Sequence, residues 1–499
     1  HAETTAAATE VLKAGGNAVD ALIAAVWAAC VAEPVFCSPG GGGHALLRLH
    51  GRAPVIADFF TQTPLMRRLD GLDFYPIYGN FGTDVQEFHI GMASAAVPGM
   101  VAGLFALHGR HASMPMELLL QPAIALARAG VVLNGTQAEA LRILEPIVRA
   151  TSGSARLFGL VGQHDALPEP GQRVANPDLA DCFQYLAEQG ADAFYRGDIA
   201  ARIAQASVAS GGQIGLQDLS RYRVLWRRPM KWTLADATVW SNPPPAFGGL
   251  MVALMTGALE RGLPRQTDFG SPAHIEALAA AMRASDQQRL DLERPECLRS
   301  SRVLKRSFEA LLGTGGRVSK GTTHISVRDR RGNLAGMTIS NGEGCGQVIP
   351  GCGFMLNNML GEQDLNRLGF HQWPVNRRLS TMMAPTLVRR GEVNLVLGSG
   401  GSNRIRTAIA QVLCNTMHFG MDLKSAIEAP RLHLENDVLA IEMDPKGWPK
   451  DLPGRIRDAA AQIRFWPARS LFFGGVNAVS DVAAAADPRR QGAAWEECI

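Results

Sequence analysis

The pattern of apolar and polar positions predicts two helices at the start of the chain. Ala2 to Lys13 is alanine-rich with helical spacing and ends at Gly15-Gly16. Asn17 is a candidate cap for a second helix, Ala18 to Ala32, which is apolar on nearly all faces and so must be covered by protein. Its uncharged part, Ala21 to Ala32, is about 12 residues long. A bilayer span needs roughly 18–20, so we expect a buried helix and no membrane span.

Runs with strand character follow in both halves of the chain. Four glycines, Gly40 to Gly43, precede an apolar run from His44 to Leu49, which indicates a strand whose backbone lies close against another segment. Val55 to Phe60 is a second predicted strand. In the other half, polar and apolar residues alternate from Thr322 to Asp329, and Leu334 to Ser340 is rich in apolar residues. The Arg-Arg-Gly-Asn turn between these two runs predicts a hairpin.

Helices and a linker are predicted between these strands. Gln137 to Asp236 has the pattern of several amphipathic helices, as in a helical outer layer. Glu296 to Gly321, rich in Arg, Lys, Ser and Gly, is the candidate for a flexible linker that carries a processing site. Asn394 to Leu397 is a short apolar strand that runs into a glycine-rich loop, Gly398 to Arg404, before a helix from Ile405 to Met417. The pattern alone indicates a mixed α/β protein.

Composition excludes some classes of function. The 499 residues, 46% hydrophobic and 19% charged, are typical of a globular protein with a sizeable core. A net charge of +3, without basic runs interleaved with aromatics, argues against a nucleic-acid partner. Eight cysteines lie scattered without a Cys-x-x-Cys pair, so we expect no metal, no cofactor and no disulfide scaffold, although Cys345 and Cys352 could pair across a loop.

The N-terminal residues show no charged segment followed by an apolar core. No signal peptide is therefore visible, and a cytoplasmic location is favoured over a periplasmic one. His1 is not an initiator methionine, so this expectation covers only the residues of the sequence as given.

Thr322, at the predicted start of the hairpin, is the candidate nucleophile. A threonine at a new N-terminus carries its own α-amino group as general base, with an ordinary pKa of about 7.7–8.0. The run Thr-Thr-His-Ile-Ser-Val-Arg-Asp-Arg-Arg-Gly-Asn resembles the small-subunit start of the γ-glutamyltranspeptidase (glutathione hydrolase) family of N-terminal-nucleophile hydrolases. Members of that family cut their own chain immediately before the first threonine of this motif. Thr-Thr-His alone would be an ordinary strand start.

Further motifs resemble the same family and keep its order along the chain. They are Gly15 to Ala21, Gly40 to Gly43, Gly91 to Gly103, Asn242 to Leu250, Pro350 to Asn358, Ser380 to Thr386 and Ala486 to Arg489. The resemblance implies an α+β fold, a four-layer αββα sandwich. It also implies autocleavage between Gly321 and Thr322, which would give a large-subunit segment, 1–321, and a small-subunit segment, 322–499, that stay associated.

The resemblance also assigns catalytic roles. Ser340 aligns with a threonine whose hydroxyl bonds to the nucleophile. Backbone amides of Gly401 and Ser402 align with the oxyanion hole, and a shift of one residue would assign Gly400 and Gly401 instead.

Phe60 is the main departure from the family. It stands where γ-glutamyl enzymes have an arginine that binds the α-carboxylate of the substrate, and an uncharged aromatic cannot neutralise that charge. Arg67 and Arg68 could substitute from another angle, but two solvated surface arginines are the simpler interpretation.

Other substrate-binding positions are changed or kept. Ser380 and Thr381 align with hydroxyls that hold the substrate carboxylate. Glu362 aligns with an aspartate that binds the substrate amino group, whereas Gly342 replaces an asparagine with the same task and Met359 replaces a glutamine. We therefore expect a small amide substrate that contains an acyl group other than γ-glutamyl.

The expected activity is an autoprocessing amide hydrolase or acyltransferase that works through an acyl-enzyme. Two alternatives stay open. One is a true γ-glutamyltransferase or glutathione hydrolase that uses Arg67 or Arg68. The other is a non-catalytic relative that acts as a binding protein.

Overall fold

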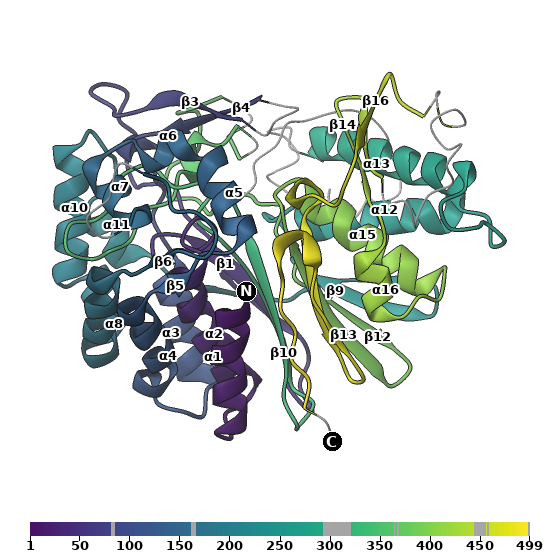
Figure 1. Cartoon of the computed structure of the whole chain (residues 1–499), viewed down its shortest axis with the longest axis horizontal. Coiled ribbons are helices and arrows are strands. Elements are labelled where there is room, and N and C mark those ends of the chain that lie inside the picture. Colours follow the sequence, from purple (N-terminus) through teal and green to yellow (C-terminus); the bar gives the residue numbers. More distant parts are fainter. Residues whose placement is uncertain are drawn as a thin grey trace.

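The structure, a computed structural model, describes residues 1–80, 85–160, 166–292, 321–363, 365–366, 369–443, 456 and 459–497. Within these ranges, two antiparallel sheets lie face to face at the centre of the molecule (Figure 1). The first has the order β10 (Thr323–Arg328), β11 (Leu334–Ser340), β1 (Gly42–Arg48), β2 (Val55–Phe59) and β7 (Leu225–Arg227). The second has the order β18 (Ala484–Ala485), β17 (Gly475–Ser480), β13 (Val393–Gly400), β12 (Thr386–Arg390), β9 (Ala237–Ser241) and β8 (Met230–Leu234).

Helices cover the outer side of each sheet, so the fold has the αββα layers that the resemblance implied (Figure 1). On the first sheet lie α2 (Ala18–Ala32) and α3 (Met100–His111). Helices α1 (Ala2–Lys13) and α4 (Met116–Ala129) pack on α2, and α8 (Pro177–Gln189) packs on α4. Farther out are α5 (Gly135–Ile143), α6 (Glu145–Val148), α7 (Ser152–Phe158), α9 (Ala191–Tyr195), α10 (Asp198–Ala209) and α11 (Leu216–Arg221). On the second sheet lie α12 (Gly248–Gly262), α15 (Arg404–Met417) and α16 (Leu423–Glu428), and α13 (Pro272–Leu292) packs on α12.

Smaller sheets extend the two halves. They are β3 (Tyr75–Asn80) with β4 (Val85–Ile90), β5 (Val131–Val132) with β6 (Arg173–Val174), and β14 (Leu432–Glu435) with β15 (Val438–Glu442) and β16 (Gln462–Trp466).

Helix α2 is the centre of the larger core, as its apolar sequence predicted. Every one of its residues is buried. Its first turn is closed by a capping box, in which the Asn17 side chain accepts from the Asp20 amide and the Asp20 carboxylate accepts from the Asn17 amide. None of the helices in the described ranges is long and apolar enough for a membrane span.

Most of the expected elements occur where the sequence placed them. The hairpin of β10 and β11 pairs Thr323 with Ile339 and Arg328 with Leu334. Helix α15 begins one residue earlier than expected, and β13 is longer than the predicted Asn394 to Leu397, so the glycine loop starts inside the strand.

Three expectations need correction or lie outside the structure. Gln137 to Asp236 was predicted to be helical, but it also contains β7 and β8, edge strands of the two sheets on either side of Arg228-Pro229. Such short edge strands give only a weak alternating pattern. Of the predicted linker, Glu296 to Gly321, only Gly321 is among the described residues. Cys345 and Cys352 are buried free thiols and do not pair with each other.

Candidate active site

A small, partly open pocket lies where the start of β10 meets the glycine loop after β13. It brings together seven of the residues that the sequence assigned to the site: Phe60, Gly321, Thr322, Ser340, Glu362, Thr381 and Ser402. The rest of its lining is apolar and consists of Met359, Leu365, Met382, Met383 and Ile405. Gly400, Gly401 and Ser380 are not among the residues that line it.

Thr322 immediately precedes β10, and its surroundings fix the start of that strand. Its carbonyl oxygen accepts a hydrogen bond from Arg490 Nη1 at 2.9 Å. The next hydroxyl, Thr323 Oγ1, lies 3.5 Å from both carboxylate oxygens of Glu33, and the His324 carbonyl accepts a hydrogen bond from the side-chain Nδ2 of Asn477 at 2.9 Å. The nucleophile candidate therefore sits on a strand end that is held from several sides.

Ser340 lies at the carbonyl that autocleavage would attack. Its hydroxyl donates a hydrogen bond to the Gly321 carbonyl oxygen and accepts one from the Gly342 amide at 3.0 Å. A hydroxyl that donates to a carbonyl oxygen stabilises the negative charge that develops there during nucleophilic attack. The predicted bond to the Thr322 hydroxyl is not among the contacts of Ser340, so that role stays a prediction.

Gly321 fits only as glycine. A Cβ at this position would come within 1.8 Å of the Gly342 carbonyl oxygen. The Gly321 amide lies 3.3 Å from Glu343 Oε1. The bond before Thr322 is thus pressed against the turn that follows β11.

The glycine loop runs directly beside Thr322. A Cβ on Gly400 would come within 2.1 Å of the Thr322 carbonyl oxygen. Gly401 has φ 114° and Ser402 has φ 51°, and helix α15 begins two residues later. The backbone amides and the dipole of a helix N-terminus favour a negative charge nearby. Which two amides form an oxyanion hole, Gly401 with Ser402 or Gly400 with Gly401, stays a prediction.

Phe60 forms an apolar wall of the pocket. It is 1% exposed and packs with Met359, Leu365 and Met383. Its ring stacks on His44 at 5.9 Å between centroids. Burial lowers the pKa of His44 to about 4, although the nearby Asp58 opposes the shift, so this imidazole is neutral at pH 7.

Arginines near Phe60 point elsewhere. Arg378 donates to the Phe60 carbonyl oxygen, and its Nε lies 3.3 Å from an Asp58 oxygen. These contacts hold its guanidinium away from the pocket, which it does not line. Arg67 and Arg68 are exposed and do not line the pocket.

Glu362 and Gly342 form a matched pair. Glu362 is 6% exposed, and a Cβ on Gly342 would come within 2.4 Å of its Oε1. The longer glutamate therefore occupies space that a side chain at position 342 would need.

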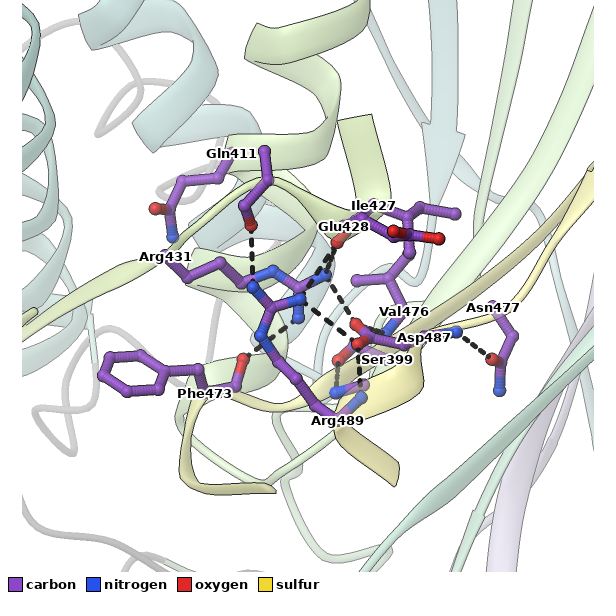
Figure 2. A network of polar contacts seen from close by, with 12 residues as sticks. Ser399, Gln411, Ile427, Glu428, Arg431, Phe473, Val476, Asn477, Asp487 and Arg489 are labelled. Atoms are coloured by element: carbon purple, nitrogen blue, oxygen red, sulfur yellow. Dashed lines mark hydrogen bonds and ion pairs between the residues drawn. The ribbon is translucent and has the colours of Figure 1, made fainter. Parts of the chain in front are cut away.

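A buried ionic network braces the strand next to the glycine loop (Figure 2). Arg431 Nη2 lies 2.6 Å from Asp487 Oδ2, and Arg489 Nη1 lies 3.2 Å from Asp487 Oδ1. Burial opposes ionisation of Asp487, but the two arginines outweigh it and hold its pKa below the usual value. Asp487 also accepts from the Val476 amide at 2.9 Å, which ties the C-terminal segment to β17.

A threonine at the start of a strand in one of two helix-covered sheets, beside a glycine loop of the other sheet, is the arrangement of an N-terminal-nucleophile hydrolase. The model of the family described as gamma-glutamyltranspeptidase matches residues 4–496. The chain therefore belongs to the γ-glutamyltranspeptidase family, and it is an enzyme of the hydrolase and acyltransferase type.

Two relatives show the range of this family. The glutathione hydrolase proenzyme of Escherichia coli K12 is 29% identical over 90% of this chain and 82% of its own length. The acylase ACY 1 proenzyme of Pseudomonas sp. V22 is also 29% identical, over 89% and 83%. The structure of a cephalosporin acylase from Bacillus halodurans has the same fold, with a TM-score of 0.77 at 22% identity, covering 99% of this chain and 94% of that one.

Sequence reasoning missed part of the site. Met382 and Met383 stood inside a recognised motif, but only the neighbouring hydroxyls were considered. Leu365 and Ile405 carried no chemical signal. Arg490 directly follows the last matched motif, Ala486 to Arg489, and this position was the one sequence signal that it could belong to the site.

The conformation of Ser402 leads to a stability prediction. Glycine adopts this left-handed conformation without a steric cost, so Ser402→Gly should raise the free energy of unfolding by about 0.5–1 kcal/mol. Ser402→Ala keeps a Cβ and should give no such gain. Urea unfolding of both variants measures the difference, and equal stabilities would show that the backbone conformation carries no cost here.

Proposed function

We propose that the chain is an autoprocessing N-terminal-threonine amide hydrolase or acyltransferase that prefers an apolar acyl group to γ-glutamyl. The carrying observation is that Thr322 shares its pocket with Phe60, Met359, Met382 and Met383, and that no arginine lines it among the described residues. An apolar wall favours burial of an apolar acyl group and leaves a carboxylate without a partner.

Cleavage of the chain would come first. The Thr322 hydroxyl oxygen attacks the Gly321 carbonyl carbon, the peptide C–N bond breaks, and the Thr322 amine takes up the proton and becomes free. Water then hydrolyses the ester between the two residues. The hydrogen bond from Ser340 to the Gly321 carbonyl supports this step, since it would stabilise the developing oxyanion.

The two segments produced by cleavage would remain associated in one folded protein. Strand β1 of the large-subunit segment pairs with β11 of the small-subunit segment from Gly42 opposite Ser340 to Arg48 opposite Leu334. The second sheet likewise combines β9 with β12. Ladders of this length keep the two segments associated after one peptide bond is cut.

The second step repeats the chemistry on a substrate amide. The Thr322 amine takes the proton of the hydroxyl, the oxygen attacks the substrate carbonyl, and the glycine loop would hold the oxyanion. The leaving amine departs with a proton, and the acyl-enzyme is resolved by water or by an acceptor amine.

Electrostatics disfavours a γ-glutamyl donor. Its α-carboxylate would enter a pocket whose charged lining side chain among the described residues is Glu362, which has the same sign. An apolar acyl group with a protonated amine remains compatible with Glu362. The exposed positions of Arg67 and Arg68 weaken the alternative of a true glutathione hydrolase, and the assembled pocket weakens the alternative of a non-catalytic binding protein.

Intact mass tests the nucleophile. The purified protein should give two fragments, residues 1–321 and 322–499, because Thr322 cuts the bond before it. Thr322→Ala should stay a single chain. A wild-type chain that stays whole after long incubation would contradict the proposal and favour a binding protein.

Gly321→Ala tests the fit of the cleaved bond. The added Cβ would meet the Gly342 carbonyl oxygen at 1.8 Å, so cleavage should slow by at least about 100-fold. Gly109→Ala is a matched control, because a Cβ there meets nothing within 4 Å. Gel analysis over time gives both rates, and cleavage of Gly321→Ala at the wild-type rate would exclude the described geometry.

Donor preference tests the pocket. We expect kcat/KM for a hexanoyl or phenylacetyl p-nitroanilide to exceed that for γ-glutamyl-p-nitroanilide by about 30-fold or more, the factor expected from an unpaired charge. Phe60→Arg should reverse the order, whereas Phe60→Leu should keep it. Efficient turnover of the γ-glutamyl compound by the wild type would refute the apolar assignment.

A further inference from the structure

Arg490 reaches the nucleophile from the far end of the chain. It ends the short 3-10 helix Pro488–Arg490, next to the ionic network of Asp487 and Arg489. Its Nη1 donates to the Thr322 carbonyl oxygen at 2.9 Å. Among the described residues, it is the cation that contacts Thr322 directly.

Two glycines, Gly400 and Gly475, leave room for this side chain. A Cβ on Gly475 would come within 2.5 Å of Arg490 Cδ, and one on Gly400 within 2.9 Å of Nη1. A Cβ on Gly401 would lie 3.5 Å from Arg490 Nη2, which is an ordinary van der Waals distance. A side chain at position 400 would collide with the guanidinium and one at 475 with the aliphatic part of Arg490, so the loop beside the nucleophile and Arg490 are fitted to each other.

The guanidinium stays charged in this position. It lies over the Phe36 ring, 5.2 Å from the centroid, in a mostly protein environment. Burial lowers the pKa of Arg490 to about 10, with Glu33 acting in the opposite direction, so the group is a cation at neutral pH.

We propose that Arg490 is a positioning residue for the nucleophile: it fixes the Thr322 carbonyl against the glycine loop and places a positive charge beside the α-amino group that serves as base. The inference rests on the proposed function, since that amino group exists only after cleavage. Holding the carbonyl limits rotation of the threonine backbone and so keeps hydroxyl and amine aligned with the loop amides.

The charge of Arg490 acts against those of several carboxylates near Thr322. Glu33 lies under Thr323, Glu343 lies 3.3 Å from the Gly321 amide, and Glu362 faces the nucleophile from the pocket. Carboxylates favour the protonated amine, whereas a cation favours the neutral amine that can accept a proton. Removing the Arg490 charge should therefore raise the pKa of the Thr322 amine and move the acid limb of the rate profile to higher pH.

Arg490→Met and Arg490→Lys test this role in the processed, full-length protein. Arg490→Met should lower kcat by about 10- to 100-fold, with a smaller change in KM, and should move the acid limb of kcat/KM up by about one pH unit. Arg490→Lys keeps the charge, so its acid limb should stay within a few tenths of a unit of the wild type while part of kcat returns. Arg328→Met removes a guanidinium paired with Asp481 at 2.9 Å at the other end of β10, and should leave kcat and the limb unchanged.

The outcomes separate this inference from the proposed function. An active wild type together with an Arg490→Met variant of unchanged kcat and unchanged acid limb would overturn the role of Arg490 alone. A wild type that neither cleaves nor turns over amides would overturn the proposed function. If Arg490→Met does not fold, Arg490→Lys decides, because a shifted acid limb in that variant would show that charge is not what Arg490 supplies.

Discussion

The close approach of β10 and β13 is the constraint on which the candidate active site depends. Gly398 and Gly400 are two residues apart on β13, so both lie on the face of the strand that is directed toward the other sheet. A Cβ on Gly398 would come within 2.3 Å of the His324 ring, and one on Gly400 within 2.1 Å of the Thr322 carbonyl oxygen. Because these positions carry no side chain, the strand that starts after Thr322 can lie directly against the strand that ends in the glycine loop.

The contact between the two strands has a structural role at His324, which lies against Gly398, and a proposed chemical role at Thr322, which lies against Gly400. The ring nitrogens of His324 contact Thr338 Oγ1 at 2.8 Å and Ser326 Oγ at 2.9 Å, and burial lowers its pKa to about 3. A neutral, fully bonded imidazole fills the gap between the sheets and is not available as a base. The proton acceptor of the proposed reaction is therefore left to the amine of Thr322, which makes the charges around that amine decisive.

Local elements could be predicted from the sequence because their signals are local. Periodicity and caps defined α2 and the hairpin of β10 and β11, and motif order placed Thr322, Ser340 and Glu362 in one site. Phe60 and Met359 were found by motif comparison, but the contribution of Met383 to the apolar wall could not be predicted, because Phe60 and Met383 meet only after the two sheets are assembled. Arg490 is 168 residues from Thr322 in the chain, and no spacing rule connects them. The secondary-structure propensities of the residues do not determine how the layers pack against each other, so these contacts could not be predicted.

In the proposed mechanism, cleavage and substrate turnover make different demands on the same pocket. During cleavage the acyl side of the broken bond is Gly321, which has no side chain and lies against Gly342. It therefore makes no use of the apolar wall around Phe60, whereas a substrate acyl group would occupy it. Changes at Phe60, or the paired change of Gly342 and Glu362, can alter the accepted acyl group without removing the contacts of Ser340 and the glycine loop that cleavage needs. A family with one self-cleaving core can in this way contain both glutathione hydrolases and acylases.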